Sequence, residues 1–191
     1  MNNAAAGVAE KRRQFEDLAR LHEGVMLRTA TRMCGGNRDR AEDLVQDSFV
    51  RAYEAFLAGK FDPGGNPKAW LLRIVTNLFI NDYNRRKRWE APADLDTLTA
   101  EDAAQPEAFI VESPEEQILS RTLDEPIEKA LAGLSDDFRL CVLLVDVEGL
   151  EYAEAAKALG IPIGTVRSRL ARARIALHNS LYSYAKSIGR A

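Results

Sequence analysis

The chain has 191 residues, of which 29% are charged and 46% hydrophobic, and its formal net charge is −3. Its apolar runs are only a few residues long, whereas a membrane-spanning helix needs roughly 20, and no apolar stretch follows the basic residues near the start, so a transmembrane protein and a secretory signal are excluded. Two cysteines far apart, Cys34 and Cys141, form neither a disulfide scaffold nor a four-ligand zinc site, and we therefore expect an intracellular, reducing compartment.

The charge is distributed unevenly along the chain. Residues 1–90 carry 16 Lys and Arg against 12 Asp and Glu, residues 91–128 carry one Arg against 11 acids, and residues 129–191 carry 9 against 6. The acidic middle also contains prolines, which is typical of a linker. Charge and proline content therefore predict two mildly basic segments, joined by an acidic flexible linker over residues 90–113.

Apolar residues at helical spacing predict three helices before the linker. The first covers about residues 11–33. The second begins at a capping box formed by Asp39 and Glu42 and reaches about residue 58, and the third covers about residues 68–88. Each has one apolar face, so we expect the three helices to pack into a bundle.

The outward faces of the second and third helices differ in chemistry. The second presents Asp43, Gln46, Asp47, Val50 and Glu54. The third presents Arg73, Thr76, Asn77, Ile80 and Asn84, with Trp70 at the edge and a basic end at Arg85, Arg86, Lys87 and Arg88. An acidic face suits a protein partner with a basic surface, whereas aromatic, amide and cationic groups together are typical of sites that hold unstacked bases. For both helices a solvated outer face, with Trp70 packed in the core, remains the alternative.

After the linker the pattern predicts four more helices, covering about residues 114–132, 135–147, 152–159 and 165–180. Ser135 and Thr165 are the expected caps of the second and fourth of them. No strand pattern competes with a helical one. The predicted fold class is therefore all-α, with two helical bundles, residues 11–89 and 114–185, on either side of the linker.

The last two predicted helices and the turn between them show a further sequence pattern. Gly160 stands where the first of them must end in a left-handed residue, and the second has an apolar stripe at Val166, Leu170, Ala173 and Leu177. Away from that stripe lie Arg167, Ser168, Ala171, Arg172 and Arg174. This is the pattern of a helix-turn-helix with a basic recognition helix. Arginine binds phosphates and grips guanine with two hydrogen bonds, and the free N–H groups at the Thr165 end can bind a phosphate. The alternative is an ordinary helical hairpin with a solvated face, but residues 167–174 hold four Arg and no acid, which favours DNA.

Four motifs together resemble a known family. Residues 41–53 (AEDLVQDSFVRAY) and 70–77 (WLLRIVTN) resemble region 2 of bacterial sigma factors. Residues 146–150 (DVEGL), followed by 164–170 (GTVRSRL), resemble region 4. The length and the two-bundle plan, with no domain between the bundles, are similar to the extracytoplasmic-function (ECF, group 4) sigma factors.

This resemblance implies partners and residue roles. Core RNA polymerase would be bound through its clamp-helix coiled coil and its flap, the former by Asp43, Gln46, Asp47 and Val50. The −10 promoter element would be bound by Trp70, Arg73, Asn77, Arg85, Arg86, Lys87 and Arg88, with Asn77 capturing a flipped base. The −35 element would be bound by Thr165, Arg167, Ser168, Ala171, Arg172 and Arg174. The resemblance also implies control by an anti-sigma factor, which would hold the chain at the membrane or release it to the nucleoid, and it implies no cofactor and no metal.

Two other classes of protein compete with it, and the two cysteines have an interpretation of their own. A one-component helix-turn-helix regulator with an N-terminal sensing bundle predicts a ligand pocket in residues 11–89 and tight DNA binding without polymerase. An enzyme is disfavoured, because the sequence shows no phosphate loop, no metal-ligand spacing and only two histidines, His22 and His178. Cys34 and Cys141 are interpreted as small buried hydrophobic residues, with a redox switch as the alternative.

Overall fold

The structure, a computed structural model, describes residues 2–90 and 123–189. Within these two ranges every regular element is a helix, which confirms the predicted all-α class for them. Apart from Glu90, the predicted linker over residues 90–113 lies outside the described residues, as does the helix start expected near residue 114.

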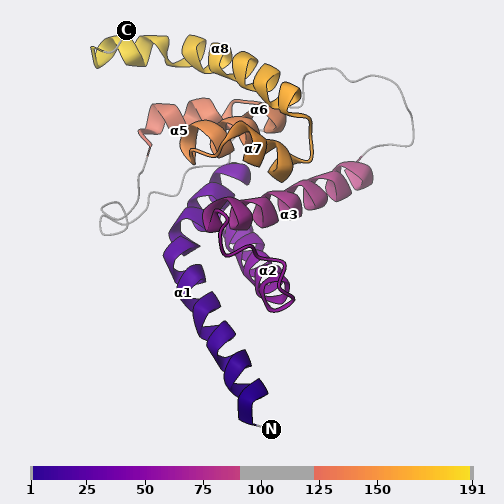
Figure 1. The fold of residues 1–191 in the computed structure, drawn as a ribbon. Helices are drawn as coiled ribbons and strands as arrows, with labels where there is room; N and C mark the ends of the chain where they lie inside the picture. The colour runs from indigo at the N-terminus through magenta and orange to yellow at the C-terminus, as the bar shows by residue number, and fades with distance from the viewer. Residues whose placement is uncertain (1, 91–122, 190–191) are drawn as a thin grey trace.

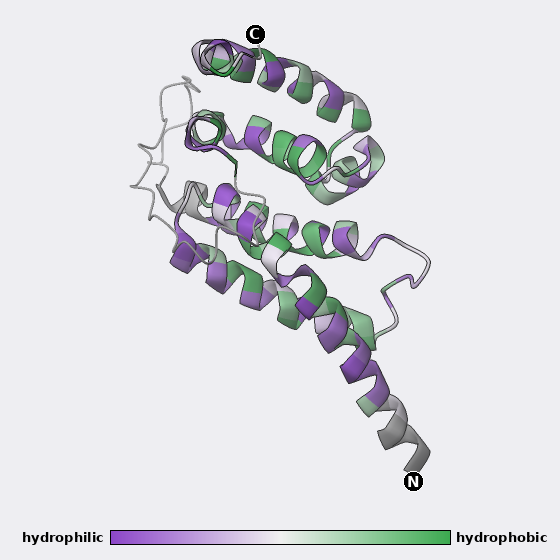
Figure 2. Ribbon diagram, turned by 90° about the vertical axis from the view of Figure 1, so that its left-hand side faces the viewer, coloured by the Kyte–Doolittle hydropathy of each residue, from purple (hydrophilic) through white to green (hydrophobic). Residues whose placement is uncertain are grey.

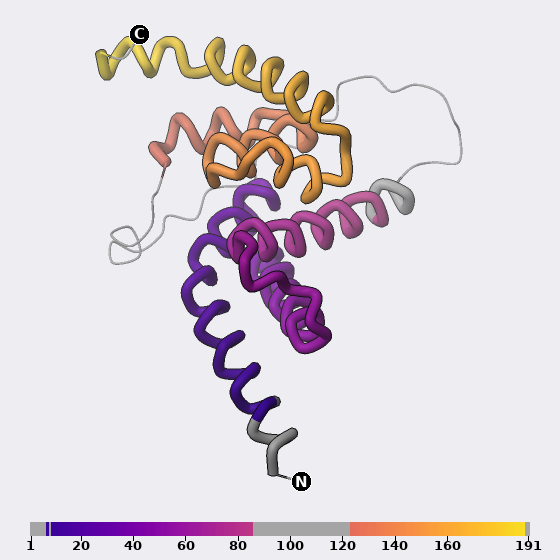
Figure 3. The backbone as a smooth tube through the Cα atoms, viewed as in Figure 1, coloured from indigo at the N-terminus to yellow at the C-terminus, as the bar shows by residue number. Residues whose placement is uncertain are grey.

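The first bundle consists of α1 (Asn2–Met33), α2 (Arg38–Leu57) and α3 (Pro67–Glu90). Figure 3 shows the N-terminal part of α1 extending beyond the bundle, whereas its C-terminal part packs against α2 and α3. The helix α1 begins earlier than predicted, because its alanine-rich first residues are strong helix formers without an apolar face to reveal them.

The start of α2 corrects the predicted capping box. Its N-cap is Asn37, whose side-chain oxygen accepts a hydrogen bond from the backbone N–H of Arg40 at 3.0 Å. Gly35 and Gly36, with φ of 66° and 93°, turn the chain so that Asn37 is extended at the cap position. Asp39 lies inside the first turn instead, where a negative charge interacts favourably with the helix dipole.

The second bundle consists of α5 (Glu125–Ala132), α6 (Asp136–Val142), the π-helix η1 (Leu143–Val147), α7 (Tyr152–Leu159) and α8 (Ile163–Ser187). The predicted helix over residues 135–147 is therefore an α-helix whose last turn widens. The last helix begins before the expected cap at Thr165, because the extended residue Pro162 is its N-cap. A proline fixes the backbone angle φ close to the value needed at that position.

The two bundles pack against each other, mainly through α3 and α7. Figures 1 and 2 show stacked layers, with α8 outermost, then α5, α6 and α7, and then α3 above α1 and α2. Apolar faces, green in Figure 2, lie between these layers. Buried side chains of both bundles, such as Leu72 of α3 and Ala155 of α7, belong to one continuous hydrophobic cluster. This contact between the bundles was not predicted from the sequence.

Candidate nucleic-acid interface

The turn between α7 and α8 sets the geometry of the helix-turn-helix. A capping box between Glu151 and Glu154 starts α7, and Gly160 ends it with φ 66° and ψ 28°, a left-handed conformation that side chains other than glycine disfavour. On α8, the side chains of Val166, Leu170 and Ala173 are at most 1% exposed. The apolar stripe predicted from the sequence is thus the face that fixes α8 on the bundle.

The opposite face of α8 is open to solvent. Arg167, Ser168, Ala171 and Arg172 are exposed, and Thr165 is half-buried. The Ser168 hydroxyl donates a hydrogen bond to the Thr165 carbonyl at 3.1 Å, which holds this short side chain close to the helix. Arg167 and Arg172 form no ion pair with any residue in the described ranges, so their guanidinium groups are available to an external anion.

The other two arginines of this helix are held by acids of their own bundle. Arg169 lies 3.0 Å from the Asp137 carboxylate, and Arg174 lies 2.6 Å from the Asp146 carboxylate in η1. The hydrogen bond to Asp146 is the main reason why the pKa of Arg174 is raised above its usual range. These two acids are far from α8 in the sequence, so the spacing of the arginines could not reveal that the pairs form.

The outward face of α3 is narrower than predicted. Arg73 and Asn77 are exposed, but Thr76 is fully buried, so its predicted outward position is wrong. Trp70 is half-buried and packs on Phe61, with ring centroids 4.8 Å apart at 53°. Trp70 therefore belongs to the edge of the bundle core and at the same time borders the exposed polar face.

The basic end of α3 is partly neutralised. The Arg85 guanidinium donates to the Asp82 carboxylate at 2.8 Å, and Arg40 of α2 donates to the same carboxylate at 3.1 Å. The helix continues through Arg86, Lys87 and Arg88, whose side chains lie outside what the structure describes.

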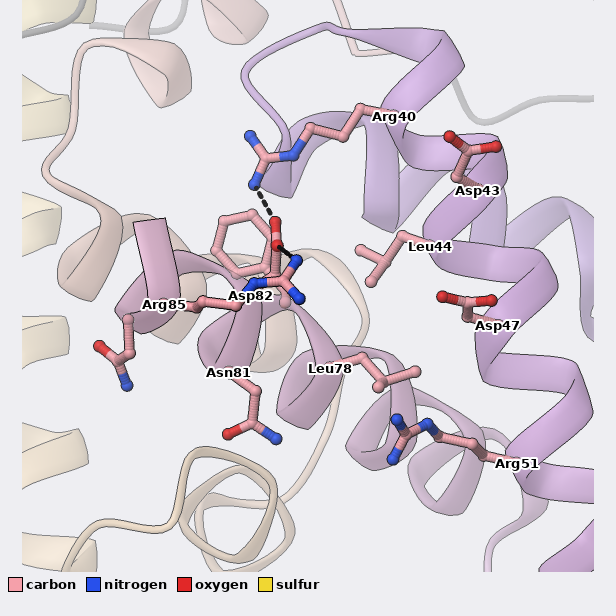
Figure 4. Close-up of a pocket in the computed structure, with 11 residues that line it drawn as sticks. Arg40, Asp43, Leu44, Asp47, Arg51, Leu78, Asn81, Asp82 and Arg85 are labelled. Atoms are coloured by element: carbon pink, nitrogen blue, oxygen red, sulfur yellow. Dashed lines mark hydrogen bonds and ion pairs between the residues drawn. The ribbon is translucent and has the colours of Figure 1, made fainter. Parts of the chain in front are cut away.

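The predicted acidic face of α2 is exposed as expected, since Asp43, Gln46, Asp47 and Val50 all face solvent, Val50 with 59% of its surface. Beside it, between α2 and α3, lies a groove of about 630 Å³ (Figure 4). It is lined by Arg40, Asp43, Leu44, Asp47, Arg51, Leu78, Phe79, Asn81, Asp82, Asn84 and Arg85. An apolar floor with charges of both signs on the walls suits a protein segment better than a small apolar ligand.

The described residues contain no cluster of His, Cys, Asp and Glu that could hold a metal ion. Nor does any helix among them have the length and apolar character needed to cross a membrane.

These features define a class of protein: an all-helical chain with a basic helix-turn-helix and a second bundle that carries an acidic face and a polar-aromatic face. Comparison with known families is more specific. Residues 18–90 match Sigma-70 region 2, and residues 124–177 match Sigma-70, region 4. The chain belongs to the ECF RNA polymerase sigma factors.

The similarity to individual members extends over most of the chain. The ECF RNA polymerase sigma factor SigE of Mycolicibacterium smegmatis is 38% identical over 170 residues, which are 87% of this chain but 61% of that relative. The ECF RNA polymerase sigma factor EcfG of Rhodopseudomonas palustris is 37% identical over 77% of this chain and 74% of its own length. Among solved structures, the sigma factor RpoE of Bartonella quintana, in complex with the anti-sigma factor NepR, has a TM-score of 0.68 at 30% identity and covers 88% of this chain and 97% of that one.

Proposed function

We propose that this chain is an alternative sigma factor, which binds core RNA polymerase, directs it to promoters through −10 and −35 elements, and helps to open the DNA. The observation that carries the proposal is the exposed recognition helix α8, on which Arg167 and Arg172 are free of acidic partners among the described residues. Family membership supplies the setting in which such a helix works.

The −35 contact is assigned to the exposed face of α8. Arg167 and Arg172 supply donors for base edges or phosphates, and the small side chains of Thr165, Ser168 and Ala171 near them allow the helix to approach the groove closely. The first turn, which begins at Ile163, adds backbone N–H groups for a phosphate. Arg174 can bind DNA only if its ion pair with Asp146 opens. We therefore assign it to a contact with the DNA phosphate backbone at the edge of the interface.

The −10 contact is assigned to α3. Asn77 and Arg73 are exposed on consecutive turns, next to the half-buried Trp70, so an unstacked base would meet an amide, a cation and an aromatic edge together. Arg85, Arg86, Lys87 and Arg88 follow on the same helix and would bind the phosphates beside that base.

The core-polymerase contact is assigned to the acidic face of α2. Asp43, Gln46 and Asp47 present acceptors around the exposed Val50, a combination that suits a basic coiled coil such as the clamp helices. The groove between α2 and α3 extends this surface. We assign residues 11–89 to the domain that binds core and the −10 element, and residues 114–185 to the domain that binds the −35 element and the polymerase flap.

The proposal includes regulation and location. The similar sigma factor RpoE forms a complex with the anti-sigma factor NepR, and we propose that an anti-sigma factor likewise controls this chain. The chain would act in the cytoplasm at the nucleoid, as a transcription initiation factor without catalytic activity, metal or cofactor.

The competing one-component regulator requires a ligand pocket in the first bundle. The groove beside α2 is lined largely by charged side chains, whereas small-molecule sites are mostly apolar and enclose their ligand. The lining of this groove therefore does not favour the second function.

Run-off transcription tests the proposal directly. Purified chain and core polymerase are combined on a set of candidate promoters. We expect transcripts only when the chain, core and a promoter with both elements are present. If the chain stimulates transcription by core polymerase on none of the promoters, and binds DNA tightly without core polymerase, the proposal is wrong and the chain is a one-component regulator.

A further inference from the structure

Two of the four arginines in the first half of α8 are held by acids from the layer beneath it (Figure 1). Arg169 contacts both carboxylate oxygens of Asp137 in α6 at 3.0 Å. Arg174 likewise contacts both oxygens of Asp146 in η1, at 2.6 and 3.1 Å. Contacts with two parallel bonds are the strong form of this ion pair, because a guanidinium and a carboxylate are planar groups of matching shape.

Each of these arginines has a further neighbour that holds it. The hydrogen bonds of Arg174 with Asp146 and with Tyr152 of α7 raise the pKa of its guanidinium above the ordinary value. Burial raises the pKa of the Cys141 thiol, and the charge and hydrogen bond of Arg169 partly offset that rise, so Arg169 lies directly beside this thiol. Both guanidinium groups are therefore held against their own bundle.

The two held arginines lie on opposite flanks of the stripe that fixes α8 on the bundle. At 3.6 residues per turn, Arg169 and Arg174 lie about 70° to either side of the centre of Val166, Leu170 and Ala173. A helix in the major groove has phosphates on both sides, because the groove is only about as wide as the helix. Once released, both long side chains could reach those phosphates, which carry no sequence information.

The π-helical turn η1 allows both acids to face α8. Asp137 and Asp146 are nine residues apart, which in a regular α-helix is about two and a half turns and would place them on opposite sides. In η1 the N–H of Glu148 donates to the carbonyl of Leu143 at 2.9 Å, five residues earlier, so that this turn contains more residues than an α-helical turn. The wider turn reduces the angle between the two acids.

These ion pairs change the charge that α8 presents to DNA. Residues 163–187 contain four arginines, one lysine and no acid, and such a helix attracts any DNA, because phosphate contacts are the sequence-independent part of binding. Asp137 and Asp146 neutralise two of these charges. Arg167 and Arg172 are exposed and have no acidic partner among the described residues, so the available charge is on the face that can approach base edges.

We infer that Asp137 and Asp146 are positioning residues that make DNA binding by α8 selective, because they hold Arg169 and Arg174 away from the phosphates that every sequence offers. This role rests on the proposed contact of α8 with the −35 element. A released arginine adds a phosphate contact on any DNA. On non-promoter DNA the helix can take the orientation that favours this contact most, whereas base contacts fix its orientation on the −35 element. Removal of either acid should therefore strengthen non-promoter binding more than −35 binding.

The test uses the full chain and Asp146→Asn, which removes the charge and keeps the shape of the side chain. Fluorescence anisotropy measures binding to a duplex of random sequence at several salt concentrations. We expect the affinity to rise roughly three- to tenfold, and the slope of log affinity against log salt to become steeper by about one, because one more phosphate is neutralised. Asp146→Glu keeps the ion pair and should keep the wild-type slope. Asp17→Asn, on the exposed side of α1, removes the same charge far from α8 in the sequence and is the control.

An Arg174→Ala background shows whether Asp146 acts through this arginine. With no guanidinium to release, Asp146→Asn should leave the salt slope of the Arg174→Ala chain unchanged. A normal slope in Asp146→Asn alone, or equal steepening with and without Arg174, would overturn the positioning role. Weaker binding to every duplex by a chain of normal helix content would also overturn it, since a residue that only supports the fold acts in that direction.

The second readout is the ratio of the affinities for a −35 duplex and for a scrambled duplex of the same composition. The −35 sequence is taken from a promoter that is active in the run-off assay. We expect the ratio to fall several-fold in Asp146→Asn, and further when Asp137→Asn is added, and an unchanged ratio would contradict the selectivity role. If no promoter is active, the sigma-factor function fails, whereas the random duplex still shows whether the acids restrain the arginines.

Discussion

Arg174 of α8 and Asp146 of η1 form a two-bonded ion pair, with donor–acceptor distances of 2.6 and 3.1 Å. It ties the recognition helix to the π-helical turn beneath it. Arg172, two residues earlier, is exposed and has no such partner within the described ranges. Two arginines of one basic helix therefore have different environments, and their substitutions should have different consequences.

Arg172→Ala should weaken −35 binding by about 1–3 kcal/mol and relax preference at one base position, if its guanidinium binds a base edge. The free energy of unfolding should hardly change, because the side chain is exposed. Arg174→Ala should instead lower the free energy of unfolding by about 1 kcal/mol or less, as is typical of partly exposed pairs, with a smaller effect on sequence preference. Fluorescence anisotropy on a set of −35 duplexes and thermal melts measure the two effects.

Salt dependence separates the possible contacts of Arg172. If it only touches phosphate, every duplex should bind more weakly to the same extent, and the slope of log affinity against log salt should fall by about one. An Arg172→Ala chain that matches the wild type in preference and in slope would show that this residue faces solvent in the complex.

Asp47→Arg should weaken binding to core polymerase, since a positive charge would replace an acceptor in the centre of the exposed acidic face of α2. The fold should be retained because Asp47 is exposed. Glu23→Arg, on the exposed side of α1, makes the same charge change away from this face and is the control. Pull-down on core and a thermal melt measure both properties, and normal core binding by folded Asp47→Arg would contradict the assignment.

The helix-turn-helix could be predicted from the sequence because its signals are local. Val166, Leu170 and Ala173 repeat at helical spacing, and Gly160 marks the one place where the chain must be left-handed. The exact starts of the helices are harder to predict from the sequence, because several residues near each start can serve as the N-cap. Asn37 rather than Asp39 caps α2, and Pro162 rather than Thr165 precedes α8.

No local sequence pattern indicates the contact between the two bundles. Glu148 binds Thr29 and Lys68, which are 119 and 80 residues away, so no local spacing connects these three residues. Thr76, predicted on the outward face of α3, is fully buried instead. Such positions follow from tertiary packing, which single-helix periodicity does not contain.

Cys34 should react slowly with alkylating reagents. Burial raises the pKa of its thiol to about 11, so at pH 8 the thiolate fraction, and with it the alkylation rate, should be on the order of 100-fold below that of the unfolded chain. Burial also raises the pKa of Cys141, which disfavours a rapid redox switch. Because the unfolded thiol loses its proton first as the pH rises, stability should fall between the ordinary pKa of 9.0 and about 11.

Mass spectrometry of iodoacetamide-treated chain, native and in urea, measures the alkylation, with Cys34→Ala and Cys141→Ala assigning each site. Denaturant titrations at rising pH measure the stability. Alkylation of native Cys34 at the rate of the unfolded chain would show an accessible thiolate, and would reopen the redox interpretation.

Asn77→Ala should slow promoter opening without changing −35 binding or core association. Asn77 is exposed on α3 near Arg73 and Trp70, and its amide both donates and accepts, as the Watson–Crick edge of a flipped base requires. Unstacking a base costs a few kcal/mol, which a pocket has to offset. Permanganate footprinting of the −10 thymines measures the opening on duplex DNA and on a template mismatched across the −10 element. The mismatched template should restore only part of the loss, because it removes the melting cost but not the missing base contact. Full opening of the duplex by Asn77→Ala would refute the capture role and leave the outer face of α3 as solvated surface.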